Sequence, residues 1–230
     1  MNDRPLVKIH AVRAAEICRR FDLKSEVSAL LNDNMGPREF LEALESNRHY
    51  LAGIDFIAHA LPPREAIWWG CLCLQHACGD GPFTLERAAG KAAVQWVLQP
   101  TEENRAAAKA SAEATVPGSV AGALAEAVTL TGEVRPSSET SPGFAESFGP
   151  AKAVIRAIKI ATTKVGPLKI FETQRLLLEL GIGAVEGRFL PPDSVGRLPA
   201  PQSLRDAPRR IAGDSGVSGS AAMVRNQKQG

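Results

Sequence analysis

The residues with the richest chemistry lie close together in one apolar segment, residues 64–78. This segment contains Cys71, Cys73, His76 and Cys78, and thiolates combined with an imidazole are familiar zinc ligands. On a helix, however, Cys71 and Cys78 share one face while Cys73 and His76 share another, because successive side chains diverge by ~100°. One straight helix does not close a tetrahedral site from these four residues, so we expect no metal here.

The same cysteines are poorly placed for nucleophilic catalysis. A reactive thiolate needs a helix N-terminus or a nearby cation to stabilise it. These thiols lie in the middle or at the C-terminal end of the expected helix, where the helix dipole disfavours negative charge. Because free cysteine is among the most frequently buried residue types, we interpret the three as structural thiols.

Asp55 and His59 form a second candidate pair. Their i, i+4 spacing on a helix lets a carboxylate orient an imidazole, as in general-base pairs. No nucleophile or second acid is recognisable beside them, and the spacing also suits an ordinary ion pair near a helix end. We favour an ordinary ion pair or a cap-side contact at the helix C-terminus, and we therefore assign no catalytic, cofactor-binding or metal-ligating residue.

Three tryptophans, Trp68, Trp69 and Trp96, suit either a core or an exposed anchor for a partner protein. Adjacent tryptophans on a helix diverge by ~100°, so at most one of Trp68 and Trp69 faces solvent if the other is in the core. We favour a core position for both.

The elements that position these residues are expected to be helices. Hydrophobic residues make up 44% of the 230, and alanine and leucine dominate them over β-branched and aromatic types. Apolar periodicity and capping residues predict helices at 10–21, 25–31, 37–46, 47–60, 64–78, 84–99, 102–114, 117–130, 151–164 and 167–185. Val12 and Cys18 are expected on the buried face of the first helix, Leu51 on that of the fourth, and Leu168 and Phe171 in the core beside the last. The predicted class is all-α, as a helical bundle or a short stack of antiparallel helix pairs.

Two segments differ from the helices in composition. Residues 131–150 are rich in Gly, Pro, Ser, Thr and Glu, and predict a loop that joins two helical parts, as a linker in preference to a binding loop. Residues 190–230 contain no aromatic residue and predict a disordered basic tail. From Arg188 onward, six Arg, one Lys and three Asp carry +4, which leaves −2 for the preceding region. We therefore divide the chain into a helical domain, 1–189, and a tail, 190–230.

Charge and composition also limit the possible partners and compartment. A net charge of +2 supplies no large field for nucleic acid or an anionic membrane. The longest apolar run, 66–74, is much shorter than the ~20 residues that cross a bilayer. Arg19-Arg20 resembles a twin-arginine export signal, but no apolar core follows it. Three of the four cysteines share one expected helix, which does not suit a disulfide framework. We expect a soluble, cytoplasmic protein.

Four stretches carry a resemblance to a known family. They are Ala60-Leu-Pro-Pro-Arg-Glu-Ala-Ile-Trp-Trp69, Ala93-Val-Gln-Trp96 with Pro100-Thr-Glu-Glu-Asn-Arg105, Gly149-Pro-Ala-Lys-Ala-Val154, and Leu178-Glu-Leu-Gly-Ile-Gly-Ala-Val-Glu-Gly187. In these stretches the chain resembles an uncharacterised bacterial family of all-helical proteins, a domain of unknown function associated with type VI secretion gene neighbourhoods. The resemblance extends over about residues 40–188, excludes the tail and assigns no catalytic or ligand residue. The chain departs from the pattern at Thr129-Leu-Thr-Gly132-Glu, where the family has an aromatic residue followed by Ser-Gly-Gly.

These observations favour a non-catalytic helical adaptor or accessory protein that binds another protein, and the resemblance implies a link to a bacterial secretion assembly. The alternative is an enzyme with a pocket near Asp55, His59 and the Trp- and Cys-rich helix. Binding of nucleic acid would need a basic concave face, which the slight acidity of the helical domain disfavours. We expect neither a cofactor nor a membrane partner.

Overall fold

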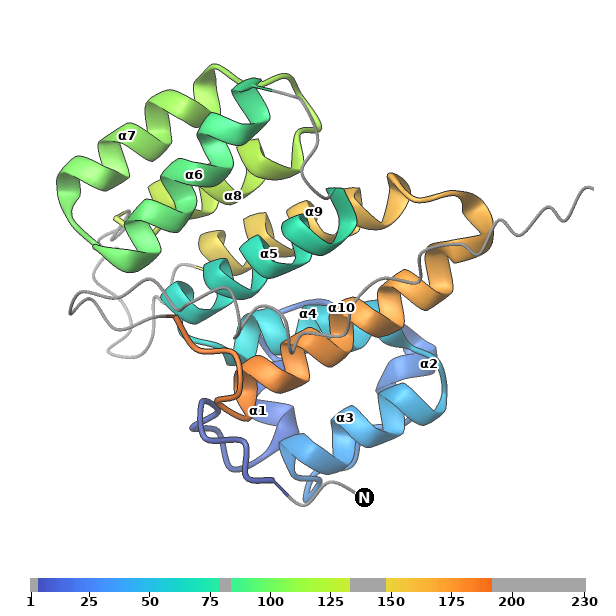
Figure 1. The fold of residues 1–230 in the computed structure, drawn as a ribbon. Helices are drawn as coiled ribbons and strands as arrows, with labels where there is room; N and C mark the ends of the chain where they lie inside the picture. The colour runs from blue at the N-terminus through green and yellow to red at the C-terminus, as the bar shows by residue number, and fades with distance from the viewer. Residues whose placement is uncertain (1–3, 79–83, 133–147, 192–230) are drawn as a thin grey trace, which may run out of the picture. The chain divides into compact units, whose positions relative to one another are not determined.

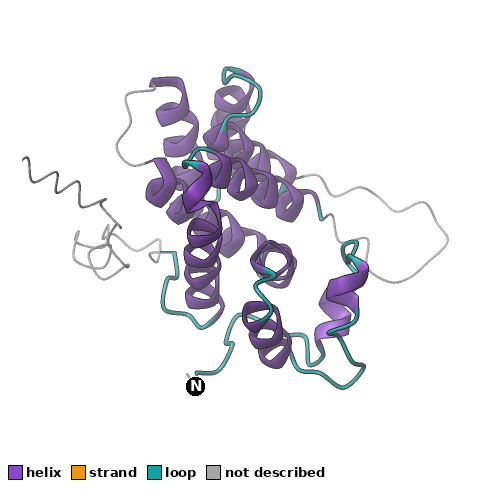
Figure 2. Ribbon diagram, turned by 90° about the vertical axis from the view of Figure 1, so that its right-hand side faces the viewer, coloured by secondary structure: helices purple, strands orange, loops and turns teal. Residues whose placement is uncertain are grey.

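The computed structural model describes residues 4–78, 84–132 and 148–191, and within these ranges it consists of helices and connecting loops without a strand (Figures 1 and 2). The all-α prediction is confirmed. Residues 133–147 of the predicted loop and 192–230 of the predicted tail lie outside the described residues, as does the side chain of Cys78.

The helices of the described residues follow one another with short connections. They are α1 (Ala14–Cys18), α2 (Ser25–Ser28), α3 (Pro37–Ser46), α4 (Tyr50–Ala60), α5 (Pro63–Cys78), α6 (Thr84–Leu98), α7 (Glu102–Glu113), α8 (Val120–Leu130), α9 (Gly149–Thr163), the 3₁₀ helix η1 (Pro167–Lys169) and α10 (Ile170–Val185). None of these helices is both long and apolar enough to span a membrane.

The first predicted helix is longer than the observed one. Arg13 has an extended backbone and precedes the first turn of α1, and its N–H donates to the Glu16 carboxylate at 3.2 Å. The helix therefore begins at Ala14, and Val12, predicted on its buried face, is exposed, whereas Cys18 is buried as expected. The second predicted helix is also longer than the observed one, because α2 ends at Ser28.

Helices α5 and α9 form the middle of the fold. They contact one another and both contact α8; α5 also contacts α6, and both α5 and α9 contact α10 (Figure 1). On its other side α9 contacts α4, which packs against α10 and α3. Helix α5 has to be apolar around most of its circumference because neighbours surround it, as the sequence indicated. Gly70 lies so close to Leu124 of α8 that a Cβ there would clash.

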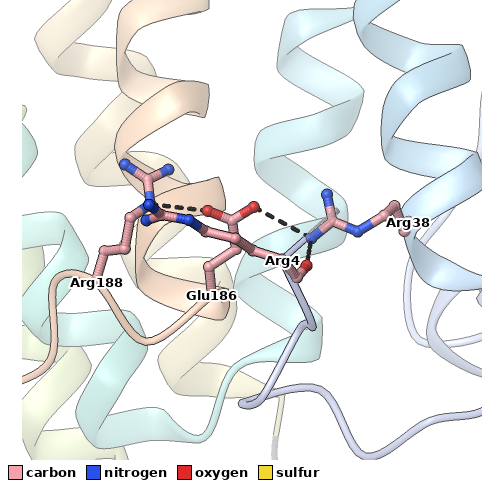
Figure 3. Close-up of polar contacts among 4 residues, drawn as sticks. All are labelled: Arg4, Arg38, Glu186 and Arg188. Atoms are coloured by element: carbon pink, nitrogen blue, oxygen red, sulfur yellow. Dashed lines mark hydrogen bonds and ion pairs between the residues drawn. The ribbon is translucent and has the colours of Figure 1, made fainter. Parts of the chain in front are cut away.

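A buried carboxylate fastens the end of α10 to α3 and the N-terminal segment. The Glu186 side chain is only 1% exposed and lies 3.1 Å from Arg38 Nη2 and 2.8 Å from Arg188 Nε (Figure 3). Arg38 also donates to the main-chain oxygen of Arg4, and the N–H of Lys8 donates to the main-chain oxygen of Val185 at 3.1 Å. The N-terminal segment is thus attached to the last helix.

Candidate functional site

A pocket of about 390 Å³ opens where the segment after α1 meets α4 and α9. Its lining combines four cationic side chains, two carboxylates, an imidazole and two apolar side chains. The lining residues are Arg19, Arg20, Phe21, Asp22, Asp55, His59, Lys152, Ile155 and Lys159.

Helix periodicity explains how two of these elements present their side chains to the pocket. Asp55 and His59 are four residues apart on α4 and therefore lie on one face. Lys152, Ile155 and Lys159 are spaced by three and four residues and share one face of α9. Because α4 packs against α9, the two faces meet across the pocket.

Asp55 and His59 are both in the pocket, but they do not form an ion pair with each other. Lys159 Nζ lies 2.9 Å from Asp55 Oδ1 and 3.1 Å from Oδ2, so the carboxylate is paired with α9 instead. The imidazole Nδ1 of His59 lies 2.8 Å from the main-chain oxygen of Asp55. Of the two predicted contacts, the local one near the helix end is observed and the ion pair is not. One turn of helix brings the main-chain oxygen within reach of the ring, while a lysine from a distant segment takes the carboxylate.

The hydrogen bond to the main-chain oxygen of Asp55 determines which nitrogen of the His59 ring carries the proton. A main-chain oxygen only accepts, so Nδ1 must carry the proton and Nε2 is left as an acceptor. The His59 side chain is 4% exposed, and its Nε2 has no hydrogen-bond partner among the described residues. Its ring stacks on Phe21 at a centroid distance of 4.9 Å and lies 5.8 Å from the Phe148 ring.

Burial lowers the pKa of His59 below its usual value. The bond to the Asp55 main chain and the Asp55 charge oppose this shift, whereas the nearby cations Lys152 and Arg20 add to it. The imidazole is therefore neutral at pH 7.

Cations outnumber carboxylates in the pocket by four to two. Arg20 donates to the main-chain oxygen of His59 at 2.9 Å, and its guanidinium lies over the Phe148 ring at 5.8 Å. Arg19 and Lys152 are exposed, and neither has a hydrogen bond or ion pair with another side chain that the structure describes. Two cations are therefore available to a ligand.

Cys71 and Cys73 of α5 do not line this pocket. Cys71 and Cys73 are buried in the core. Burial raises the pKa of the Cys71 thiol to about 12 and that of Cys73 well above its usual value, with Cys71 adding to the shift at Cys73. Such thiols stay protonated and are poor nucleophiles. Within the described ranges no group of three His, Cys, Asp or Glu side chains is suited to hold a metal ion.

The tryptophans divide between the two predicted environments. Trp69 is fully buried and Trp96 nearly so, while Trp68 is half-buried against the core. The prediction of a core position is therefore confirmed for Trp69 and only partly for Trp68.

The corner between α9 and α10 has an unexpected surface. Leu168 of η1 is 99% exposed and Phe171, in the first turn of α10, is 69% exposed. Both were predicted to pack, and that prediction was wrong. Gly53 of α4 lies against Leu178 of α10, and Ile57 lies against Gly181. Residue 50, where α4 begins, therefore lies opposite the second turn of α10, and α4 does not cover the first turn.

Residues 40–185 match a protein family described as a family of unknown function, DUF6931. The chain belongs to the DUF6931 family. This match agrees with the resemblance to an uncharacterised helical family and covers nearly the same residues. No curated protein and no solved structure matches the chain.

The DUF6931 region covers only part of the pocket. It includes Asp55 and His59 of α4 and the lysines of α9, whereas Arg19 and Asp22 precede it. The corner with Leu168 and Phe171 lies wholly within the DUF6931 region.

Sequence reasoning missed the cations of the pocket. Lys152 and Lys159 have a weak signal, because their spacing places them on one face of α9. Arg19-Arg20 attracted attention only as a possible export signal. Nothing in the spacing along the chain indicates that these segments meet, since they are more than 130 residues apart in the sequence.

Proposed function

We propose that the protein is a non-catalytic helical adaptor that binds another protein through the corner between α9 and α10. The observation that supports this proposal is the exposure of Leu168 and Phe171 in adjacent turns. Single exposed leucines are common on protein surfaces, but Phe171 is also the most exposed aromatic side chain in the described part of the chain. Aromatic side chains are enriched in the buried centres of protein interfaces.

The charges beside the corner indicate the chemistry of the partner. Lys164 precedes the two apolar residues, Lys169 lies between them, and both lysines are exposed. Glu172 is the one carboxylate in this stretch. An apolar pocket bordered by carboxylates would complement such a surface, because complementary charges steer association and exclude wrong partners. We therefore propose a partner protein with an acidic rim around an apolar pocket.

The resemblance to a bacterial family adds a biological context to the proposal. We propose that the partner belongs to a bacterial type VI secretion system and that the adaptor acts in the cytoplasm. What supports this context is the resemblance of the four sequence stretches to the bacterial family associated with such gene neighbourhoods.

An enzyme is the less favoured alternative. The pocket contains Asp55 and His59, but Lys159 holds the Asp55 carboxylate, and the thiols of Cys71 and Cys73 lie elsewhere in the core. His59 thus has no nucleophile to activate among the pocket residues.

A quantitative affinity purification tests the adaptor proposal. The full chain is tagged and purified from its native cells, as wild type and as the double variant Leu168→Glu/Phe171→Glu. The matched control is Val116→Glu, which changes another exposed apolar residue. All three proteins should fold alike by circular dichroism, since all three side chains are exposed.

We expect one protein to co-purify in a stoichiometric amount with the wild type and with the control, and to be lost from the double variant. A partner retained by the double variant would contradict the proposed surface. Absence of any stoichiometric partner from the wild type would contradict the adaptor function.

A further inference from the structure

We propose that the pocket between the α1–α2 segment, α4 and α9 binds a phosphate dianion, either free or as the phosphate group of a small phosphomonoester. This site is separate from the corner between α9 and α10, so the test of phosphate binding is independent of the test of the adaptor function.

The charge of the pocket matches a dianion. Arg19, Arg20, Lys152 and Lys159 carry four positive charges against those of Asp22 and Asp55, which leaves an excess of +2 with His59 neutral. Asp55 pairs with Lys159, so the charge of that lysine is already compensated.

The available cations are of the types that bind phosphate. Arg19 provides a planar guanidinium, which binds phosphate oxygens through two parallel hydrogen bonds. Lys152 provides an ammonium group across the pocket. Both side chains are exposed and without a hydrogen bond or ion pair in the described ranges, so binding an anion breaks no existing contact.

A buried polar atom also points to a ligand. His59 Nε2 has no hydrogen-bond partner among the described residues although the side chain is almost fully buried, and native proteins rarely leave such atoms unpaired. A phosphate oxygen would complete its bonding once the ring gains a proton at Nε2, because a doubly protonated imidazole donates from both nitrogens.

Binding of a dianion favours that proton. In the free protein burial, Lys152 and Arg20 lower the pKa of His59, against the main-chain bond and charge of Asp55. The remaining charged groups of the pocket are Arg19, Asp22 and Lys159. A dianion offsets the cations and raises the pKa of His59, so binding takes up a proton. By reciprocity, the affinity for the dianion must increase as the pH falls.

The size and walls of the pocket favour an organic phosphate over the free ion. Its volume of about 390 Å³ falls within the range of small-molecule sites, roughly 300–1,000 Å³. The rings of Phe21 and His59 stack on one another, and Ile155 is the apolar lining residue of α9. These groups offer an apolar wall to the organic part of a phosphomonoester.

Isothermal titration calorimetry of the full chain tests the proposal with inorganic phosphate, phenyl phosphate and phenol. We expect saturable binding of phosphate or phenyl phosphate at one site and none of phenol. Tighter binding of phenyl phosphate identifies a phosphomonoester site, and equal binding identifies a site for the free ion. Absence of saturable binding at millimolar concentration of both phosphates overturns the proposal.

Two double variants distinguish binding in the pocket from nonspecific attraction to the net charge of the protein. Arg19→Gln/Lys152→Gln should lower the affinity by at least about tenfold, because each removes a charged hydrogen bond. The matched control, Lys91→Gln/Lys109→Gln, removes two exposed lysines of α6 and α7 and should leave the affinity unchanged. An equal loss of affinity in the control variant overturns the proposal. A phosphoserine peptide is titrated as a further probe, and binding of this peptide without binding of phenyl phosphate also overturns the proposal.

The role of His59 is tested with sulfate, which stays a dianion between pH 8 and pH 6. The wild type should gain at least about threefold in affinity on lowering the pH over this range. His59→Phe, which keeps an aromatic ring on Phe21, should bind sulfate with the same affinity at both pH values. An affinity of the wild type that does not change with pH overturns the coupling to His59.

Discussion

Trp69 donates a hydrogen bond from its indole Nε1 to the main-chain oxygen of Leu177, 3.1 Å away and 108 residues further along the chain. The bond joins α5 to α10 inside the core, where the Trp69 side chain is fully buried. Gly181, one turn beyond Leu177, lies against the same ring. The large indole thus fits because α10 offers both an acceptor and a residue without a side chain.

The two adjacent tryptophans should respond differently to replacement by phenylalanine. Trp69→Phe removes the bond to Leu177 and part of a buried ring, so we expect a loss of about 2–3 kcal/mol in the free energy of unfolding. Trp68→Phe removes an indole N–H that is buried without a partner among the described residues. That change should cost less than about 1 kcal/mol. Urea denaturation measures both, and equal losses would contradict the role of the hydrogen bond.

Gly181 should not tolerate even a methyl group. A Cβ at this position would lie 2.8 Å from Trp69 Cζ2 and 3.0 Å from Ile57 Cδ1, so Gly181→Ala should destabilise the protein by about 1–3 kcal/mol. Gly166→Ala is the matched control, since a Cβ there meets nothing within 4 Å and φ of −59° suits alanine. We expect the control to be neutral or slightly stabilising in thermal unfolding. A wild-type melting temperature for Gly181→Ala would contradict the close packing of α5 and α10.

Much of the fold could be predicted because the residues within and beside each helix indicate where it begins and which face is apolar. Pro37 at the start of α3, the cap at Thr101 and the apolar stripe of α9 are all signals carried by neighbouring residues. The errors arise where a distant segment decides. Leu168 and Phe171 have the periodicity of a buried stripe, but their exposure depends on where α4 begins.

The candidate site was only half predictable for the same reason. Asp55 and His59 were found because their i, i+4 spacing is visible within one helix. Lys159, which takes the Asp55 carboxylate, comes from α9, 104 residues further on. Local spacing carries no information about such a pairing, so both the basic character of the pocket and the partner of Asp55 required the structure.

Glu186 should matter more than any exposed ion pair. Glu186→Gln retains the shape of the side chain but removes the charge that joins Arg38 and Arg188. Because the two arginines remain partly exposed and regain water, we expect a loss of about 1–3 kcal/mol in the free energy of unfolding. Glu102→Gln, at a carboxylate that is 80% exposed, should change it by less than about 0.5 kcal/mol. Chemical denaturation compares the two variants, and equal effects would show that the Glu186 contacts contribute nothing particular.

Alkaline pH should weaken the protein through the buried thiol of Cys71. Its pKa is raised to about 12 by burial, whereas the unfolded chain releases this proton near pH 9. Above pH 9 the folded state holds more protons than the unfolded state, so stability falls as the pH rises. At pH 10 the loss amounts to about 1 kcal/mol.

The contribution of Cys71 is measured as a difference between proteins. Cys71→Ala should show a shallower fall in the free energy of unfolding between pH 8 and pH 10 than the wild type does. Lysine and tyrosine titrations contribute equally to both proteins and cancel. Parallel curves for the two proteins would rule out a raised pKa at Cys71.

The most direct test of the adaptor function is photo-crosslinking from Phe171 in living native cells. Benzoylphenylalanine is placed at position 171 or, as a matched control, at position 116, where Val116 is also exposed. After irradiation we expect position 171 to give one discrete adduct with another protein and position 116 to give none. The proposed function would be contradicted by the absence of an adduct from position 171, by equal adducts from both positions, or by an adduct with only a second copy of this chain.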